Sequence, residues 1–291
     1  MRGINIISML IGFWGFNIFP MLAQTQVKPE SVDNLICFWS FMEESGTERI
    51  SSGRCQYALR EGTPFIERVK EGVFGEYSAR IKEGEWFYIP RAQCPALNIH
   101  GKDGEVTVVA WIKRDVKQYS QCEAVAGMWD ETRKKRQYCL FLDLRIWGSS
   151  QQAGGHVSGT GGATEGYKYC MDAAIGKSKI PYSEWECIGF TYDTKKVSVY
   201  VNGYLDVRKE RNPYQYDLGL FDGGYQGSDF TVGAVNRSGE MGNFFVGQIG
   251  GLAVYDRALT KEEMRYLSWL KKEYYEKDVY FYRIIEYCMC F

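Results

Sequence analysis

Alternating apolar and polar positions run through the middle of the chain, most clearly from Trp185 to Val207. Ile188, Phe190 and Tyr192 share one face of a predicted strand, and after a polar turn the valines of the next strand also occupy every second position. The dipeptide Asn202-Gly203 follows, and both of its residues tolerate the positive φ angles of a type I′ turn. This pattern predicts an antiparallel meander with one buried face.

Similar apolar segments along the rest of the chain predict further strands. They are Leu35–Phe41, Trp86–Ile89, Glu105–Lys113, Cys122–Met128, Gln137–Ile146, Tyr167–Asp172, Asp229–Ala234 and Phe244–Tyr255. Near the end of the chain, Thr260 and Glu263 have the spacing of a capping box, so a helix is expected to begin at about Lys261. The elements together predict an all-β protein of two stacked antiparallel sheets, with a short C-terminal helix.

Long polar or glycine-rich segments separate these strands. Ser149–Gly166 is rich in Gly, Ser and Thr, holds His156 and is expected to be a loop. Asn236–Asn243 is expected to be a polar turn, and Asn212–Gly227 a Gly-, Tyr- and Asp-rich loop. Loops this long within a compact domain are usually functional or disordered, so these segments are where a site is expected.

The N-terminus has the pattern of a secretory signal. A basic start, an apolar core and a small-residue exit predict a signal peptide over residues 1–23, cleaved after Ala23. We therefore expect export to the periplasm, the cell surface or the medium, with no transmembrane segment after cleavage. A linker over 24–33, a β domain over 34–270 and an aromatic, basic tail over 271–291 complete the predicted organisation.

Charge and cysteine content narrow the function classes. The formal net charge of the chain is -1, which argues against nucleic acid as a partner, because nucleic-acid binding needs a basic surface. The basic run Arg133–Arg136 is interpreted as a solvated loop.

Nine cysteines without CxxC pairs make a zinc site improbable. Cys139 and Cys187 lie in strand patterns, where buried thiols and disulfides are both compatible with the sequence.

Four separated segments resemble the bacterial laminin-G-like domains of the concanavalin A-like lectin/glucanase superfamily. They are LICFWSFMEESGT from Leu35, VTVVAWIKRD from Val106, WECIGFTYDTKKVSVYVNGYL from Trp185 and VGQIGGLAVYDRALTKEEM from Val246. The resemblance implies a two-sheet jelly roll with a concave face flanked by loops. Some members of the family bind calcium through acidic turns, so calcium is a possible cofactor here, although no set of ligands can be named from the sequence.

Carbohydrate or cell-surface recognition without catalysis is the function that this resemblance favours. Sugars are bound by aromatic faces together with polar side chains, and loops and strand ends supply both. The candidate ligand-binding residues are Trp129, Trp147, His156, Tyr167, Tyr169, Tyr225, Asn236, Arg237 and Glu240. The expected partner is a polysaccharide or another glycan.

Two alternatives to a binding module remain open: a polysaccharide-degrading enzyme, which would be a lyase or a glycoside hydrolase, and an adhesion module. A polysaccharide lyase would use His156, Tyr167, Lys168 and Tyr169, because such enzymes abstract a proton with His or Tyr while a cation neutralises the uronate carboxylate. A glycoside hydrolase of the superfamily would need closely spaced acidic residues on one strand, and the Glu-x-Asp-x-Glu pattern is absent from the sequence. The adhesion module would bind a protein partner instead of a glycan.

Overall fold

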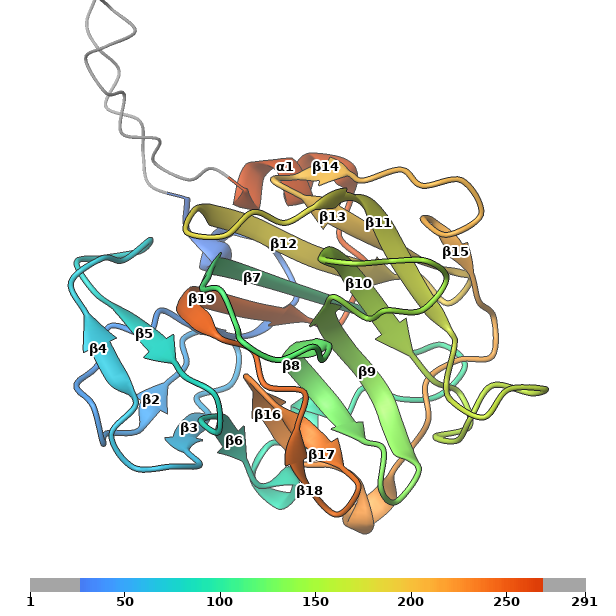
Figure 1. Ribbon diagram of the computed structural model, residues 1–291, viewed down its shortest axis with the longest axis horizontal. Helices are drawn as coiled ribbons and strands as arrows, with labels where there is room; N and C mark the ends of the chain where they lie inside the picture. Colours follow the sequence, from blue (N-terminus) through green and yellow to red (C-terminus); the bar gives the residue numbers. More distant parts are fainter. Residues whose placement is uncertain (1–26, 269–291) are drawn as a thin grey trace, which may run out of the picture.

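Two antiparallel sheets form the body of the protein. The computed structural model describes residues 27–268, so the predicted signal peptide and the tail over 271–291 lie outside the described residues. Figure 1 shows the sheets as the two layers of a sandwich. The all-β jelly-roll sandwich with one short helix near its C-terminal end, predicted from the sequence, is confirmed. Within residues 27–268, no helix is long and apolar enough to span a membrane.

The first sheet has nine strands, in the order β14-β13-β12-β7-β19-β5-β4, with β1 paired to β19 and β15 to β13. Its strands are β1 (Leu35–Trp39), β4 (Glu67–Val69), β5 (Ser78–Ile81), β7 (Val106–Arg114), β12 (Trp185–Tyr192), β13 (Lys196–Val201), β14 (Tyr204–Leu205), β15 (Tyr214–Gln215) and β19 (Gly247–Tyr255).

The second sheet has ten strands, in the order β11-β10-β9-β8-β16-β6-β3-β2, with the β17–β18 hairpin beside β8. Its strands are β2 (Arg49–Ile50), β3 (Ala58–Glu61), β6 (Phe87–Ile89), β8 (Glu123–Asp130), β9 (Lys135–Leu142), β10 (Gln152–Val157), β11 (Ala173–Lys179), β16 (Phe230–Val232), β17 (Val235–Arg237) and β18 (Glu240–Gly242). Four 3-10 turns and one helix complete the structure: η1 (Pro29–Ser31), η2 (Arg91–Gln93), η3 (Pro95–Leu97), η4 (Gly224–Gln226) and α1 (Lys261–Leu267).

The main core lies between the two sheets. Ile188 and Phe190 of β12 contribute to it from the nine-stranded sheet, and Leu140 and Leu142 of β9 contribute from the ten-stranded sheet. The alternation that predicted the β12–β13 meander therefore identified the inward face correctly. Asn202 and Gly203 have φ angles of 49° and 77°, which confirms the left-handed turn between β13 and β14.

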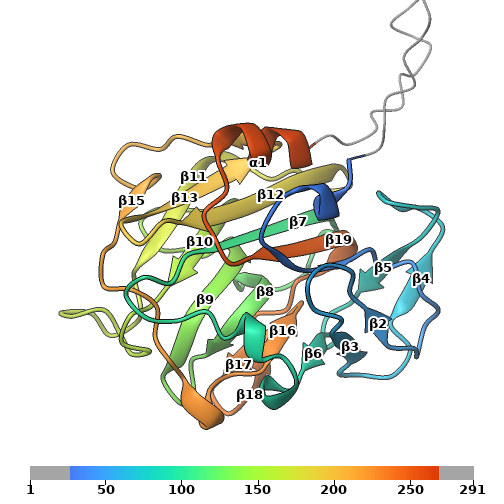
Figure 2. The same ribbon diagram turned by 180° about the vertical axis from the view of Figure 1, so that it is seen from behind.

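The outer face of the nine-stranded sheet carries a second apolar cluster. Trp111 of β7 and Tyr255 of β19 pack there against Met264 and Leu267 of α1. Figures 1 and 2 show α1 beside β14 and the N-terminal segment on the same face. Residues 27–33, within the predicted linker, pack onto this face, with Val27 and Val32 buried. The chain thus covers one outer face of the sandwich with its own apolar side chains.

Three loop and strand predictions are wrong. The glycine-rich segment around His156 is not a loop throughout, because β10 occupies Gln152–Val157 between β9 and β11. Its glycines serve close packing: a Cβ on Gly155 would lie 2.6 Å from the Phe190 side chain. The segment Tyr167–Asp172 is a loop rather than a strand. The polar turn expected over Asn236–Asn243 is the β17–β18 hairpin and its ends.

Candidate functional site

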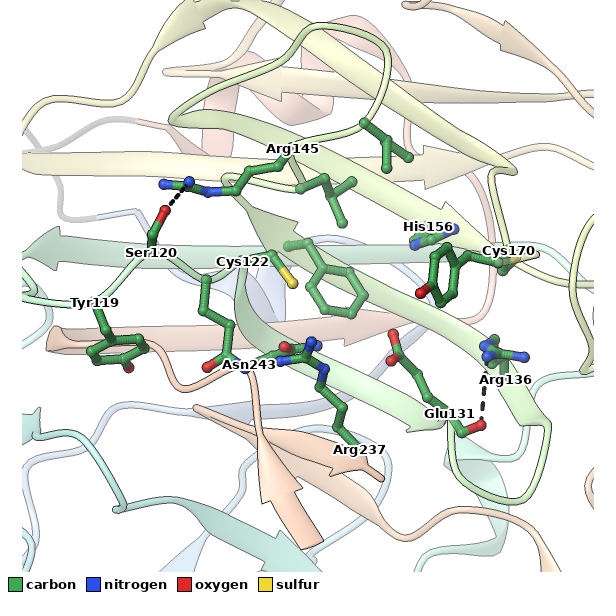
Figure 3. Close-up of a pocket in the computed structure, with 15 residues that line it drawn as sticks. Tyr119, Ser120, Cys122, Glu131, Arg136, Arg145, His156, Cys170, Arg237 and Asn243 are labelled. Atoms are coloured by element: carbon green, nitrogen blue, oxygen red, sulfur yellow. Dashed lines mark hydrogen bonds between the residues drawn. The ribbon is translucent and has the colours of Figure 1, made fainter. Parts of the chain in front are cut away.

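A pocket of about 560 Å³ lies over the outer face of the ten-stranded sheet, across β8, β9 and β10 (Figure 3). The lining combines four aromatic rings, three arginines and one carboxylate with smaller polar and apolar groups. The lining residues are Tyr119, Phe141, His156 and Tyr169; Arg136, Arg145, Arg237 and Glu131; and Ser120, Gln121, Cys122, Leu144, Ile146, Cys170 and Asn243. Such a mixture suits a ligand with both apolar faces and polar edges.

The floor of the pocket follows from strand alternation. Leu140 and Leu142 point into the main core, so Phe141 between them points outward, and His156 of β10 pairs with Cys139 of β9. Phe141 belongs to a separate small apolar cluster beneath the pocket, which includes Trp129 and Cys139. The sheet therefore presents a rigid, partly aromatic base to the ligand space.

His156 packs in this floor against two aromatic rings. Its ring lies 4.4 Å from the Trp129 ring and 5.8 Å from the Phe141 ring, measured between centroids. The residue is 5% exposed, and neither ring nitrogen has a hydrogen-bond partner among the described residues. Burial, together with nearby Arg136, lowers the pKa of His156 to about 3, against a small opposing effect of the Cys170 backbone. The imidazole is therefore neutral at physiological pH.

The arginines lie at different places around the pocket. Figure 3 shows Arg136 with Glu131 and His156 at one end, Arg145 with Ser120 at the other, and Arg237 between them. Arg145 pairs with Asp143 at 3.0 Å, whereas no ion pair is found for Arg136 or Arg237 within residues 27–268. Of the three arginines that line the pocket, Arg136 and Arg237 are therefore those without a carboxylate partner in the described part of the chain.

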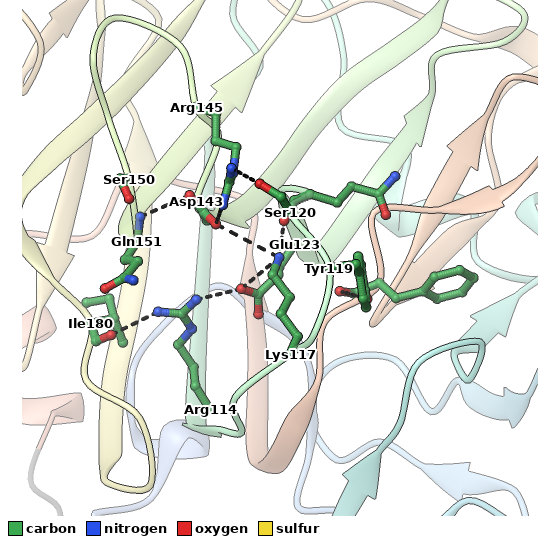
Figure 4. Close-up of polar contacts among 12 residues, drawn as sticks. Arg114, Lys117, Tyr119, Ser120, Glu123, Asp143, Arg145, Ser150, Gln151 and Ile180 are labelled. Carbon is green, nitrogen blue, oxygen red and sulfur yellow. Dashed lines mark hydrogen bonds and ion pairs between the residues drawn. The ribbon is translucent and has the colours of Figure 1, made fainter.

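A buried ion network fixes the loops at the Arg145 end (Figure 4). Glu123 accepts ion pairs from Arg114 at 2.6 Å and from Lys117 at 3.2 Å, and all three side chains are buried. Asp143 forms an ion pair with Arg145 and also accepts a hydrogen bond from the backbone N–H of Gln151. Removing one partner of a buried pair leaves an uncompensated charge, so the network is expected to hold the loop geometry tightly.

The loop from Asp143 to Gln151 also has an unusual backbone. Asp143, Arg145, Trp147 and Gln151 have φ angles of 53°, 59°, 53° and 69°, in the left-handed region that costs non-glycine residues about 1–2 kcal/mol each. Strain of this kind persists where the surroundings fix it, and it concentrates at functional sites. The hydrogen bonds to Asp143 provide that support beside the pocket.

Burial favours the protonated form of the two thiols that line the pocket. Burial raises the pKa of Cys122 to about 12 and that of Cys170 to about 11, so both are protonated at physiological pH. The seven cysteines in the described part of the chain are all free. Cys139 and Cys187 are buried thiols, which decides between the two alternatives left open for them.

No metal centre is evident in the described residues. Within residues 27–268, no group of three or more His, Cys, Asp or Glu side chains is placed to hold a metal ion. The described residues therefore offer calcium no cluster of three or more carboxylates.

The structure brings some of the predicted ligand-binding residues together. His156, Tyr169 and Arg237 line the pocket, whereas Trp129, near the end of β8, is fully buried beneath His156. Trp147 and Tyr167 contact one another edge to face at 5.6 Å, next to the pocket residue Ile146.

Other predicted residues lie elsewhere. Tyr225 is fully exposed on η4, and Asn236 of β17 and Glu240 of β18 are outside the lining. Lys168 has its ammonium 5.2 Å from the centroid of the Tyr169 ring and is also outside the lining.

Sequence reasoning missed several lining residues, and Arg136 is the clearest case. The run Arg133–Arg136 is not wholly solvated, because Arg136 is buried at the start of β9. Tyr119, Glu131, Arg145 and Asn243 also line the pocket and come from distant parts of the chain. The one available signal was the position of Arg136, directly before the predicted strand Gln137–Ile146.

Comparisons with known proteins agree with this fold. The family model of the concanavalin A-like lectin/glucanases superfamily matches residues 90–265. Among curated proteins, no sequence matches the chain.

Several solved structures share the architecture. Domain 4 of AbnA, an extracellular arabinanase from Geobacillus stearothermophilus solved with arabinotriose, superposes with a TM-score of 0.52 and 16% identity, covering 81% of this chain and 98% of that domain. A Trypanosoma rangeli sialidase mutant that displays trans-sialidase activity gives 0.53 and 18%, covering 81% of this chain and 33% of the sialidase. The binding domain of botulinum neurotoxin DC, solved with rat synaptotagmin II, gives 0.53 and 11%, covering 81% and 51%.

These identities are low, so the structural likeness shows the fold alone. The family model covers more than half of the chain, and the two-sheet sandwich has the architecture expected for that family. The chain therefore belongs to the concanavalin A-like lectin/glucanase superfamily.

Proposed function

We propose that this protein is an exported carbohydrate-binding module that holds a glycan in the pocket over β8, β9 and β10. The observation that carries the proposal is the lining of that pocket, where aromatic rings and hydrogen-bonding side chains surround one space. Aromatic rings can pack on the apolar faces of sugars while arginine, glutamine and asparagine side chains bond the hydroxyl groups. Domain 4 of AbnA, which was solved with arabinotriose, shares the fold and supports this reading.

Tyr169 is the side chain best placed to contact a sugar ring. It is exposed on the loop after β10, and it lines the pocket together with the buried His156 and Phe141. A flat exposed ring above a rigid floor forms a cleft that needs little rearrangement to accept a ligand. Trp147 and Tyr167, next to the pocket, are proposed as an extension for a second sugar unit.

Binding to immobilised or soluble polysaccharides by the purified protein tests the proposal. Tyr169→Ala is expected to weaken binding about tenfold, as the loss of one aromatic contact would. Tyr204→Ala is the matched control, because Tyr204 is equally exposed but lies on β14 of the other sheet. Equal binding by both variants, or loss of binding only in Tyr225→Ala, would place the site elsewhere. No binding to any polysaccharide would favour a protein partner.

A polysaccharide lyase is the second candidate, and one observation favours it. His156 and Tyr169 line the same pocket, and His and Tyr are the residue types that such enzymes use as proton acceptors, although the lowered pKa of His156 makes it a weak base. Absorbance of unsaturated uronates and release of reducing ends, measured during the binding assays, test this activity. Product formation that disappears in His156→Ala would establish an enzyme in place of a binding module.

A further inference from the structure

We propose that the pocket selects glycans that carry an anionic group, a carboxylate or a sulfate ester, and that this group binds beside Arg136 and His156. The inference rests on the proposed glycan-binding function and names the chemical class of the ligand. Its main support is a buried guanidinium without a carboxylate partner, placed in the wall of the pocket.

Arg136 is 8% exposed, yet its partners are two backbone carbonyl groups. It donates to Gly161 O at 3.2 Å and to Glu131 O at 3.5 Å, and its Nε has no hydrogen-bond partner among the described residues. No carboxylate of residues 27–268 lies within ion-pair distance of it. A buried charge is normally paired, because desolvation costs several kcal/mol per ion. An anionic ligand would supply the missing countercharge.

His156 provides a second observation at the same end of the pocket. Both of its ring nitrogens are buried and without a hydrogen-bond partner among residues 27–268. A neutral imidazole carries one N–H donor, and an unpaired buried donor costs about 1–3 kcal/mol. A carboxylate or sulfate oxygen at this position would accept from the imidazole as well as from Arg136.

The charge balance of the lining points in the same direction. Three arginines and one carboxylate face the pocket, and of these Arg145 is neutralised by Asp143 outside it. Arg237 is exposed on β17 and has no acidic partner in the described structure. Glu131 is the opposing group: its carboxylate lies between Arg136 and Arg237 in Figure 3 and accepts from Trp129 Nε1 at 3.4 Å. With Arg145 paired, the two arginines and the single carboxylate that remain give the pocket lining a net positive charge.

The test compares one acidic polysaccharide with its carboxyl-reduced form, which has the same linkages and no charge, and adds a desulfated pair for sulfate esters. Wild-type protein is expected to bind the acidic form at least about tenfold more tightly than the neutral form. Arg136→Gln should remove this preference, and Glu131→Gln should increase it. Arg133→Gln is the control, because Arg133 is an exposed residue of the same basic run outside the pocket.

Each outcome separates the inference from the proposed function. Equal binding of the charged and neutral polymers would overturn the inference and leave the glycan-binding proposal intact. Binding of neither polymer would overturn both. The comparison of the two polymers uses the wild-type protein, so it decides the question even if Arg136→Gln fails to fold. If Arg133→Gln removed the preference for the acidic polymer as fully as Arg136→Gln, the preference would come from the general surface charge and the proposed anion site would be wrong. The carboxylate and sulfate pairs distinguish the two sources of charge.

Discussion

The two outer faces of the sandwich differ in what covers them. The face of the nine-stranded sheet is covered by α1, the N-terminal segment and Phe74, and its cluster is apolar throughout. The face of the ten-stranded sheet has a smaller apolar cluster, and above it lie arginines, a carboxylate and loops with strained backbone. We call the first the covered face and the second the pocket face.

This difference separates stability from recognition within one fold. The covered face uses burial of apolar area, which contributes roughly 25 cal/mol per Å² and needs no ligand. The unpartnered buried polar atoms of the pocket face include nitrogens of Arg136 and His156, which line the ligand space, whereas the covered face has the indole N–H of Trp111 within an apolar cluster. A ligand that pairs the nitrogens of Arg136 and His156 would recover the cost of burying them without partners. The same architecture can thus support different functions, depending on what its pocket face carries.

The largest effect is expected from removing the central ring of each face. Trp111→Ala should lower the free energy of unfolding by about 3–5 kcal/mol, because the buried indole packs against Phe74 at 4.7 Å. The indole N–H has no hydrogen-bond partner in the described structure, so the loss is one of packing. Trp129→Ala should cost a similar amount, and it should also weaken glycan binding through His156. Denaturant titration and binding of the folded fraction measure the two effects.

The two tryptophans act as controls for each other. Both are fully buried, and they differ in the face on which they lie. If Trp111→Ala weakened glycan binding as much as Trp129→Ala while the protein remained folded, the two faces would not be separate functional regions.

A smaller effect, confined to acid pH, is expected from the histidine of the pocket face. The pKa of His156 is lowered from 6.5 to about 3, so the unfolded chain binds a proton in this interval and the folded chain does not. Stability should therefore fall as the pH decreases from 6.5 towards 3, with a slope that approaches about 1.4 kcal/mol per pH unit. His156→Phe keeps a ring of similar size and should lose this component.

Parallel denaturant titrations of both proteins between pH 3 and 7 measure the slopes. The carboxyl groups contribute equally to both proteins, so their effect cancels in the difference. Identical slopes for the wild type and the variant would show that His156 is protonated in the folded protein.

The sequence predicted the nine-stranded sheet and its helix better than the pocket face. Strand β12 was identified because Ile188, Phe190 and Tyr192 occupy alternate positions, and the start of α1 was identified from the capping box at Thr260. Both signals are local, since they depend on neighbours within a few residues. The glycines of β10 gave the opposite signal, because Gly155 admits Phe190 from the other sheet and Gly154 admits Leu144, and such contacts are not visible along the chain.

The pocket could not be assembled from the sequence for the same reason. Arg136, His156 and Arg237 line one pocket because β9 and β10 lie side by side and β17 lies beside β8 in the same sheet. Arg136 belongs to a basic run in which its neighbours Arg133 and Lys134 are exposed, so charge alone does not distinguish it. Aromatic content suggested Trp129 as a ligand contact, whereas its ring is buried beneath His156.

The smallest effect concerns the helix that completes the covered face. Thr260 accepts the N–H of Glu263 at 3.2 Å, and Glu263 accepts the N–H of Thr260 at 2.8 Å and the guanidinium of Arg257. Thr260→Ala should lower the free energy of unfolding by about 1 kcal/mol, while Thr260→Ser keeps the hydroxyl and should cost much less. Neither change should alter glycan binding, because α1 lies on the covered face, remote from the pocket lining. Thermal unfolding and polysaccharide binding of the three proteins provide the comparison. If Thr260→Ala lost glycan binding while the protein remained folded, the helix would be coupled to the pocket face. The assignment of stability to the covered face and of recognition to the pocket face would then be wrong.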